Sequence, residues 1–158
     1  MQKKANHIFC EADIFDIEYV VCHVGLLWRR LVNAKIKSLG VSGTEKRVLF
    51  CVARHPNLTQ VQIAKILDLE PQNLIRTLDK LEQQGWIEKL ADPEDRRVKC
   101  IVATISAKKI IKQINEISES VKPEILKGID STKIKAVVNN LASMRENLIQ
   151  QLEQVEKE

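Results

Sequence analysis

Polar side chains that can read the edges of DNA bases recur along residues 71–84 at the spacing of one helix face. They are Gln72, Asn73, Arg76, Thr77 and Lys80. Arginine can pair with both acceptors of a guanine, asparagine can pair with an adenine, and threonine can contact a thymine methyl group or a phosphate. Leu74, Leu78 and Leu81 fall on the other side of the same helix, where they can face a core. The segment therefore has the two faces that a recognition helix needs, although a solvated surface helix shares that pattern.

A second charged group forms the predicted tip of a β-hairpin. Asp95, Arg96 and Arg97 lie between the strand candidates 86–90 and 98–105. Adjacent arginines at a turn can reach along the DNA backbone into the minor groove, where the negative potential is enhanced. Asp95 can hold one guanidinium in place through a charge-assisted hydrogen bond. We expect this tip to contact DNA, the alternative being a turn that only aids solubility.

The elements that must position these two groups are four helices, the hairpin and two more helices. The predicted helices cover residues 13–39, 42–54, 59–67, 71–84, 106–121 and 131–158. This order predicts a mainly α protein with a small β-hairpin wing, an α+β arrangement in which residues 42–105 form a winged helix-turn-helix module. Residues 13–39 and 106–158 are expected to be dimerisation helices, and residues 13–158 a single domain.

Short-range signals mark the ends of these helices. Ser42 and Thr59 each begin a capping box, with a glutamate or glutamine three positions later. Pro71 suits the first turn of a helix, and Ser106 is expected to cap the helix after the hairpin. Pro123 should kink or end that helix because proline lacks the backbone N–H.

The flanking helices carry more apolar surface than the small middle module can cover. Their predicted dimerisation residues are Ile17, Val24, Trp28, Leu31, Ile134, Leu141, Leu148 and Val155. The last four recur every seven residues, as in the seam of a coiled coil. The simplest partner for such stripes is a second copy of the chain, so we expect a homodimer.

Composition narrows the class of protein. The 158 residues are 44% hydrophobic and 29% charged, which is typical of a soluble globular domain. The net charge of only +4 means that DNA binding must depend on a few placed basic side chains. There is no apolar run long enough to span a membrane and no signal peptide, so a cytoplasmic location is expected.

The sequence gives little support for an enzymatic, metal-binding or redox function. No GxSxG, HExxH, P-loop or GxGxxG motif occurs, so we predict neither an enzyme nor a cofactor. His7 and Cys10 have a loose ligand spacing but no carboxylate–histidine cluster, so no metal site is expected. Redox sensing by Cys10 or Cys22 stays open, yet acidic neighbours surround Cys10, and Cys22 is expected to be a buried, inert thiol.

Taken together, residues 63–67 (IAKIL), 74–87 (LIRTLDKLEQQGWI) and 95–97 (DRR) resemble the MarR family, and most closely its SlyA branch. Further matches occur at residues 27–29 and 124–129. The resemblance covers residues 17–155, and residues 1–12 look like an extension. One departure is Ala103-Thr104, where the family usually closes the second wing strand with Leu-Thr.

The resemblance implies a homodimer in which the first and last helices interlock and two winged modules straddle a pseudo-palindromic duplex. It places Arg76 in the major groove and Arg97 in the minor groove, with Asp95 steering the wing. Many relatives bind aromatic carboxylates, and Trp28, Arg29 and Arg30 are the residues expected to line such a site here. The alternative for Trp28 is plain interface core. The alternative function is a winged-helix module that binds a protein and no DNA.

Overall fold

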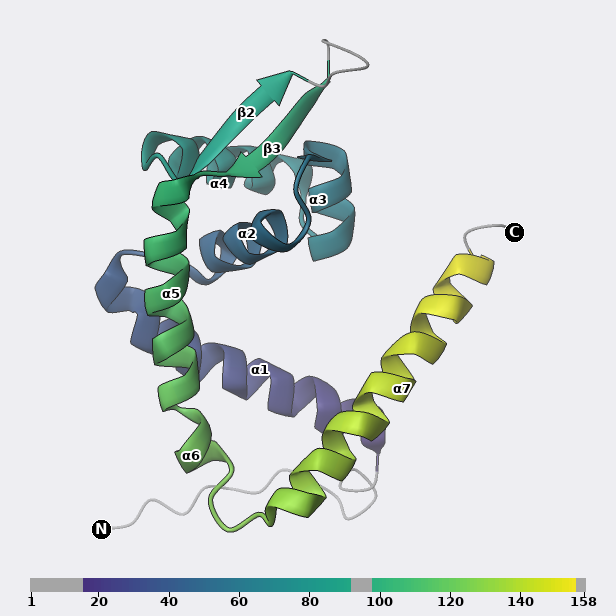
Figure 1. Ribbon diagram of the computed structural model, residues 1–158. Helices are drawn as coiled ribbons and strands as arrows, with labels where there is room; N and C mark the ends of the chain where they lie inside the picture. Colours follow the sequence, from purple (N-terminus) through teal and green to yellow (C-terminus); the bar gives the residue numbers. More distant parts are fainter. Residues whose placement is uncertain (1–15, 92–97, 156–158) are drawn as a thin grey trace. The chain divides into compact units, whose positions relative to one another are not determined.

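The computed structural model describes residues 16–91 and 98–155 and is mainly helical, with one small antiparallel sheet (Figure 1). The predicted class, mainly α with a β-hairpin, is therefore confirmed. The chain divides into two compact units, Met1–Ser120 and Val121–Glu158. Within the described residues, no helix combines the length and apolar character needed to cross a lipid bilayer.

Helix α1 spans Ile17–Ile36 and continues into a 3-10 turn, η2, at Lys37–Leu39. Asp16 caps it, because the carboxylate accepts hydrogen bonds from two backbone N–H groups of the first turn. Gly40 ends the segment with a φ of +70°, a left-handed conformation that glycine adopts at no steric cost. The predicted end of this helix is confirmed, while residues 13–15 of the predicted start lie outside the described residues.

Both predicted capping boxes are present. Helix α2 spans Gly43–Arg54, and Ser42 Oγ accepts from the Glu45 N–H at 3.2 Å while Glu45 Oε2 accepts from the Ser42 N–H at 2.9 Å. Helix α3 spans Gln60–Leu67, and Thr59 makes the same reciprocal pair with the glutamine three residues later. These bonds satisfy backbone donors that a helix start otherwise leaves open, which is why both helices begin where the sequence predicts.

Helix α4, Pro71–Gln83, follows α3 after a short turn. Asp68 makes this turn possible with a left-handed φ of +48°, a conformation that aspartate tolerates better than most residues. Pro71 lies in the first turn, where its missing N–H costs no hydrogen bond. The pair α3–α4 forms the predicted helix-turn-helix.

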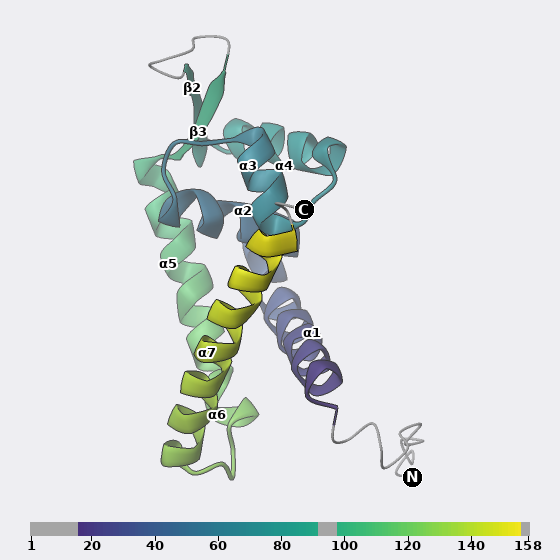
Figure 2. The same cartoon turned by 90° about the vertical axis from the view of Figure 1, so that its right-hand side faces the viewer.

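The sheet has the order β1-β3-β2. Strands β2 (Ile87–Ala91) and β3 (Lys99–Ala103) form the predicted hairpin, with their outermost paired residues at Ala91 and Lys99. Figure 2 shows the two strands extending away from helices α2 to α4. Strand β1, Leu58–Thr59, pairs with β3. The sequence did not predict β1, because two residues are too few to show an alternating pattern.

Helix α5 spans Ile105–Ser120, so its start one residue before Ser106 corrects the predicted cap. Thr104 acts as the cap instead, since its Oγ1 accepts from the Ala107 N–H at 3.3 Å. The hydroxyls of Thr104 and Ser106 both donate hydrogen bonds to the Gly85 carbonyl, at 2.7 and 2.5 Å. The end of β3 is thus tied to the turn that follows α4.

The second unit contains α6, Lys122–Ile125, and α7, Ser131–Val155. Pro123 lies in the first turn of α6, which confirms the predicted break after α5. The Asp130 carboxylate accepts backbone hydrogen bonds from the start of α7, which lowers the pKa of that group. None of the side chains of α7 is buried.

In the first unit the core forms around α2, which packs against α3, α4, α5 and β3. The predicted inward residues of α2, namely Val48, Leu49 and Val52, are buried. Their neighbours in the core are Ile63, Leu74, Leu78, Leu81, Ile87 and Ile101. The helix-turn-helix and the hairpin therefore share one apolar core, which keeps them in a defined arrangement.

The cysteines differ in exposure. Cys51 and Cys100 are buried, and burial raises the pKa of the Cys51 thiol above its usual value. Cys22 on α1 is exposed in the single chain, so the prediction that it is buried is wrong for the single chain.

We expect Leu78→Ala to lower the free energy of unfolding by about 2–5 kcal/mol, because it opens a cavity in the shared core. Leu78 is 0% exposed. The matched control is Ile75→Ala in the same helix, where the side chain is 45% exposed and the loss should be smaller. Urea denaturation followed by circular dichroism measures both, and equal losses would contradict the assigned core.

Candidate nucleic-acid interface

The rotation of α4 about its axis is set by its leucines. Leu74, Leu78 and Leu81 are buried, and the helical period then directs Gln72 and Arg76 to the opposite, exposed face. Among the described residues, none forms a hydrogen bond or ion pair with the Arg76 guanidinium. The guanidinium has five N–H donors, and no described residue of the chain accepts from them.

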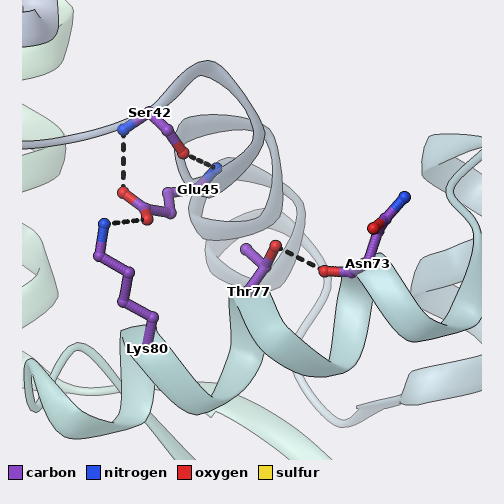
Figure 3. Close-up of polar contacts among 5 residues, drawn as sticks. All are labelled: Ser42, Glu45, Asn73, Thr77 and Lys80. Atoms are coloured by element: carbon purple, nitrogen blue, oxygen red, sulfur yellow. Dashed lines mark hydrogen bonds and ion pairs between the residues drawn. The ribbon is translucent and has the colours of Figure 1, made fainter.

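Asn73 and Thr77 lie beside each other on α4 (Figure 3). The Thr77 hydroxyl donates to the Asn73 backbone carbonyl at 2.8 Å, so its proton is used within the helix. The Asn73 side chain is exposed and points away from Thr77. The Asn73 amide is therefore better placed than the Thr77 hydroxyl to donate a hydrogen bond to a partner.

Lys80 makes a contact that the sequence did not predict. Its Nζ lies 2.5 Å from Glu45 Oε1, and the other oxygen of the same carboxylate accepts the Ser42 N–H (Figure 3). Glu45 is only 4% exposed, so Lys80 supplies the positive charge that a buried carboxylate requires. Half of the Lys80 side chain remains exposed, at 51%. Lys80 thus holds the recognition helix against the start of α2 while keeping part of its length at the surface.

The base of the wing is fastened to α4 by a three-residue ion cluster. Lys89 on β2 places its Nζ 2.7 Å from Asp79 Oδ1 and 2.8 Å from Glu82 Oε2. Its hydrogen bonds with Asp79 and Glu82 raise the pKa of Lys89 above the usual lysine value. The hairpin and the recognition helix are therefore coupled by charge as well as by the core.

Asp95, Arg96 and Arg97, the predicted wing-tip contacts, lie outside the described residues. Their roles remain predictions.

A hollow of about 540 Å³ lies between α1, α2 and α5. Trp28 and Arg29, two of the three predicted ligand-binding residues, line it, whereas Arg30 does not. Lys46 and Arg47 on α2 also line it and were missed, because their positions in the sequence give no sign that α2 faces α1 there. Burial, and then the charge of Arg29, lower the pKa of Lys46.

The predicted dimerisation residues are accessible in the single chain. Trp28 and Ile134 are half-buried. The others are exposed, namely Ile17, Val24, Leu31, Leu141, Leu148 and Val155. Large exposed apolar stripes of this kind mark interaction surfaces.

Comparison with known proteins gives a consistent result. The model of the MarR family matches residues 41–99, which contain the helix-turn-helix and strand β2 of the hairpin. The solved transcriptional regulator PA3341 is 34% identical, over 84% of this chain and 98% of that one, with a TM-score of 0.71.

Two further solved structures share the fold. The transcriptional regulator SlyA is 24% identical, over 89% of this chain and 99% of that one, with a TM-score of 0.72. CouR from Rhodococcus jostii RHA1 was solved with p-coumaroyl-CoA bound. It is 24% identical, over 85% of this chain and 95% of that one, with a TM-score of 0.69. At such identities the likeness concerns the fold, so the assignment to the SlyA branch stays a prediction.

The Lys89 cluster predicts a pH-dependent contribution to stability. Lys89→Met should cost about 1 kcal/mol or less at neutral pH, because the two carboxylates are partly exposed and screened. Since folding raises the pKa of Lys89, the stabilisation is complete below the pKa of an unfolded lysine, about 10.4, and is lost as the pH rises through the folded value.

Thermal unfolding of wild type and Lys89→Met between pH 7 and pH 11 tests this. The difference should disappear only at the alkaline end of the range. Lys99→Met, which removes an exposed lysine from β3, is the control and should follow wild type throughout. A difference that vanishes near neutral pH would rule out the ion cluster as its cause.

Proposed function

This chain belongs to the MarR family, whose members are transcriptional regulators and not enzymes, and we propose that it binds specific sites in duplex DNA as a homodimer. In this proposal, residues 42–105 form the DNA-binding module, and residues 13–39 and 106–158 form the dimerisation helices. As a DNA-binding regulator, the protein would act in the cytoplasm.

The observation that carries the proposal is the exposed face of α4. Arg76 and Gln72 face away from the buried leucines, and Arg76 has no partner among the described residues. An arginine so presented can pair with guanine O6 and N7 in the major groove. Asn73, three residues before Arg76 on the same helix, has an exposed amide that suits an adenine.

The wing is proposed to act beside this helix. Arg97 would enter the minor groove, Asp95 would orient it, and Arg96 would contact the backbone. The ion cluster at Lys89 supports this arrangement, because it limits how far the hairpin can swing away from α4. Lys80 and Thr77 would make phosphate contacts at the edge of the helix, since their polar atoms are partly used inside the protein.

The homodimer would place two recognition helices on one face of the duplex. The exposed stripes on α1 and α7 supply the apolar surface for association. A two-fold dimer reads a pseudo-palindrome with half-sites about 10 bp apart, centre to centre. Insertion of half a helical turn between the half-sites should therefore abolish tight binding.

We also propose that a small aromatic carboxylate modulates DNA binding from the hollow at Trp28. The indole offers a stacking surface, and Arg29 and Lys46 offer positive charge to the carboxylate. CouR, which shares the fold, was solved with an aromatic thioester bound. Arg30 lies outside the lining and has no part in this site.

Arg76→Ala should weaken binding to the specific site by about 1–3 kcal/mol and weaken binding to random duplex less, because only base contacts distinguish the two. Fluorescence anisotropy with a site selected from random duplexes, at one salt concentration, measures both losses. Gln83→Ala, at the far end of the same helix, is the matched control.

Two other outcomes of this experiment would change the assignment. Equal losses on the two duplexes would make Arg76 a phosphate contact. If the wild type binds no duplex at any salt concentration, DNA binding is rejected and the protein-interaction alternative is favoured.

Leu141→Glu should separate the dimer into monomers of 18.1 kDa and abolish tight DNA binding, because a charge in an apolar seam costs several kcal/mol. Ser143→Glu introduces the same charge on the opposite face of α7 and should leave the dimer intact. Sedimentation velocity tests both variants. A wild type that sediments as a folded monomer at micromolar concentration would exclude the proposed assembly.

A further inference from the structure

A second hollow adjoins the one at Trp28. Its volume is about 430 Å³, and it lies between α2, the end of α3 and α5. The two hollows share three lining residues, Lys46, Arg47 and Ser118. A molecule that enters one therefore borders directly on the other.

Positive charge dominates both hollows. Arg29, Lys46, Arg47 and Arg54 contribute to the linings, together with His55, and none of the described aspartates and glutamates does. Within the described part of the chain, no ion pair involves any of the four cations. Lys80 and Lys89, by contrast, both have carboxylate partners.

Within the described residues, the contacts of Arg47 and Arg54 are with neutral groups. Arg47 donates to the Leu67 carbonyl at the end of α3. The Arg54 guanidinium lies 5.7 Å from the centre of the Phe50 ring. Both partners are neutral. Burial, and then the repulsion from Arg29, lower the pKa of Lys46. An anion placed between such groups relieves repulsion and forms charge-assisted hydrogen bonds.

Each hollow also has apolar side chains in its lining, while Lys46, Arg47 and Ser118 form the border between the two hollows. Trp28 and Val32 line the first hollow, and Phe50, Ile66 and Leu67 line the second. The two linings together therefore suit an elongated molecule that has apolar surface for each hollow and an anionic group at each end.

We propose that the second hollow is a binding site for an anionic group, so that the effector is an elongated molecule with two anionic ends. One end lies at Arg29 and Lys46, and the other, a carboxylate or a phosphate, lies at Arg54 and His55. This inference rests on the proposed effector site at Trp28 and extends it to the helix-turn-helix. The second end contacts α3, which directly precedes the recognition helix, so occupancy of this site bears on the orientation of α4.

Matched probes of one length test the inference. Biphenyl-4-carboxylate has one anionic end, biphenyl-4,4'-dicarboxylate has two, and the phosphate ester of 4'-hydroxybiphenyl-4-carboxylate replaces one carboxylate by phosphate. Calorimetric titration into the full chain without DNA should show that a probe with two anionic ends binds about ten-fold more tightly than the single acid. Comparing the two double-ended probes tells whether carboxylate or phosphate is preferred.

Variants then locate each end. Arg54→Gln should reduce the affinity of the double-ended probes to that of the single acid, and leave the single acid unchanged. Arg29→Gln should weaken all three probes. Lys112→Gln, which removes an exposed lysine from α5 outside both hollows, is the control and should alter none.

The inference is overturned if the double-ended probes bind no more tightly than the single acid, or if Arg54→Gln leaves their affinity unchanged. Failure to bind any of the probes would overturn the effector site as well. The function as a DNA-binding regulator is judged separately, because a duplex-binding assay without any probe reports on it alone.

Discussion

Burial of three leucines on α4 determines which side chains of this helix face the solvent and can serve the proposed DNA interface. Leu74, Leu78 and Leu81 pack into the core around α2, and this fixes the rotation of the helix about its axis. Arg76 then faces outward as a geometric consequence of the helical period. A change in the packing of these leucines would turn the arginine with them, so the interface depends on an apolar constraint.

Polar contacts refine the position that the leucines establish. Lys80 meets the buried Glu45 at the start of α2, and Lys89 of the hairpin meets Asp79 and Glu82 on α4. Glu45 has two tasks, since the same carboxylate also caps α2. Helix α4 is thus tied to α2 on one side and to the hairpin on the other, which limits relative movement of the two elements that we propose to contact DNA.

Helix α2 connects the proposed DNA-binding and effector sites. Its start holds Glu45, its buried side supports α4, and Lys46, Arg47 and Arg54 line the two basic hollows. A ligand that binds these cations acts on the same rigid helix that supports the recognition helix. Coupling between the sites therefore needs only a small displacement of one element, as expected where packed cores change between discrete arrangements.

Local signals in the sequence determined where several of the elements begin and end, although the cap of α5 is Thr104 and not the predicted Ser106. The capping boxes at Ser42 and Thr59, Gly40 and the leucine spacing of α4 were sufficient, because each acts within a few residues. Only the tertiary structure decided which distant residues meet. The pairing of β1 with β3, the contact of Lys80 with Glu45 and the gathering of cations from α1 and α2 depend on packing between segments far apart in the chain, about which residue spacing carries no information.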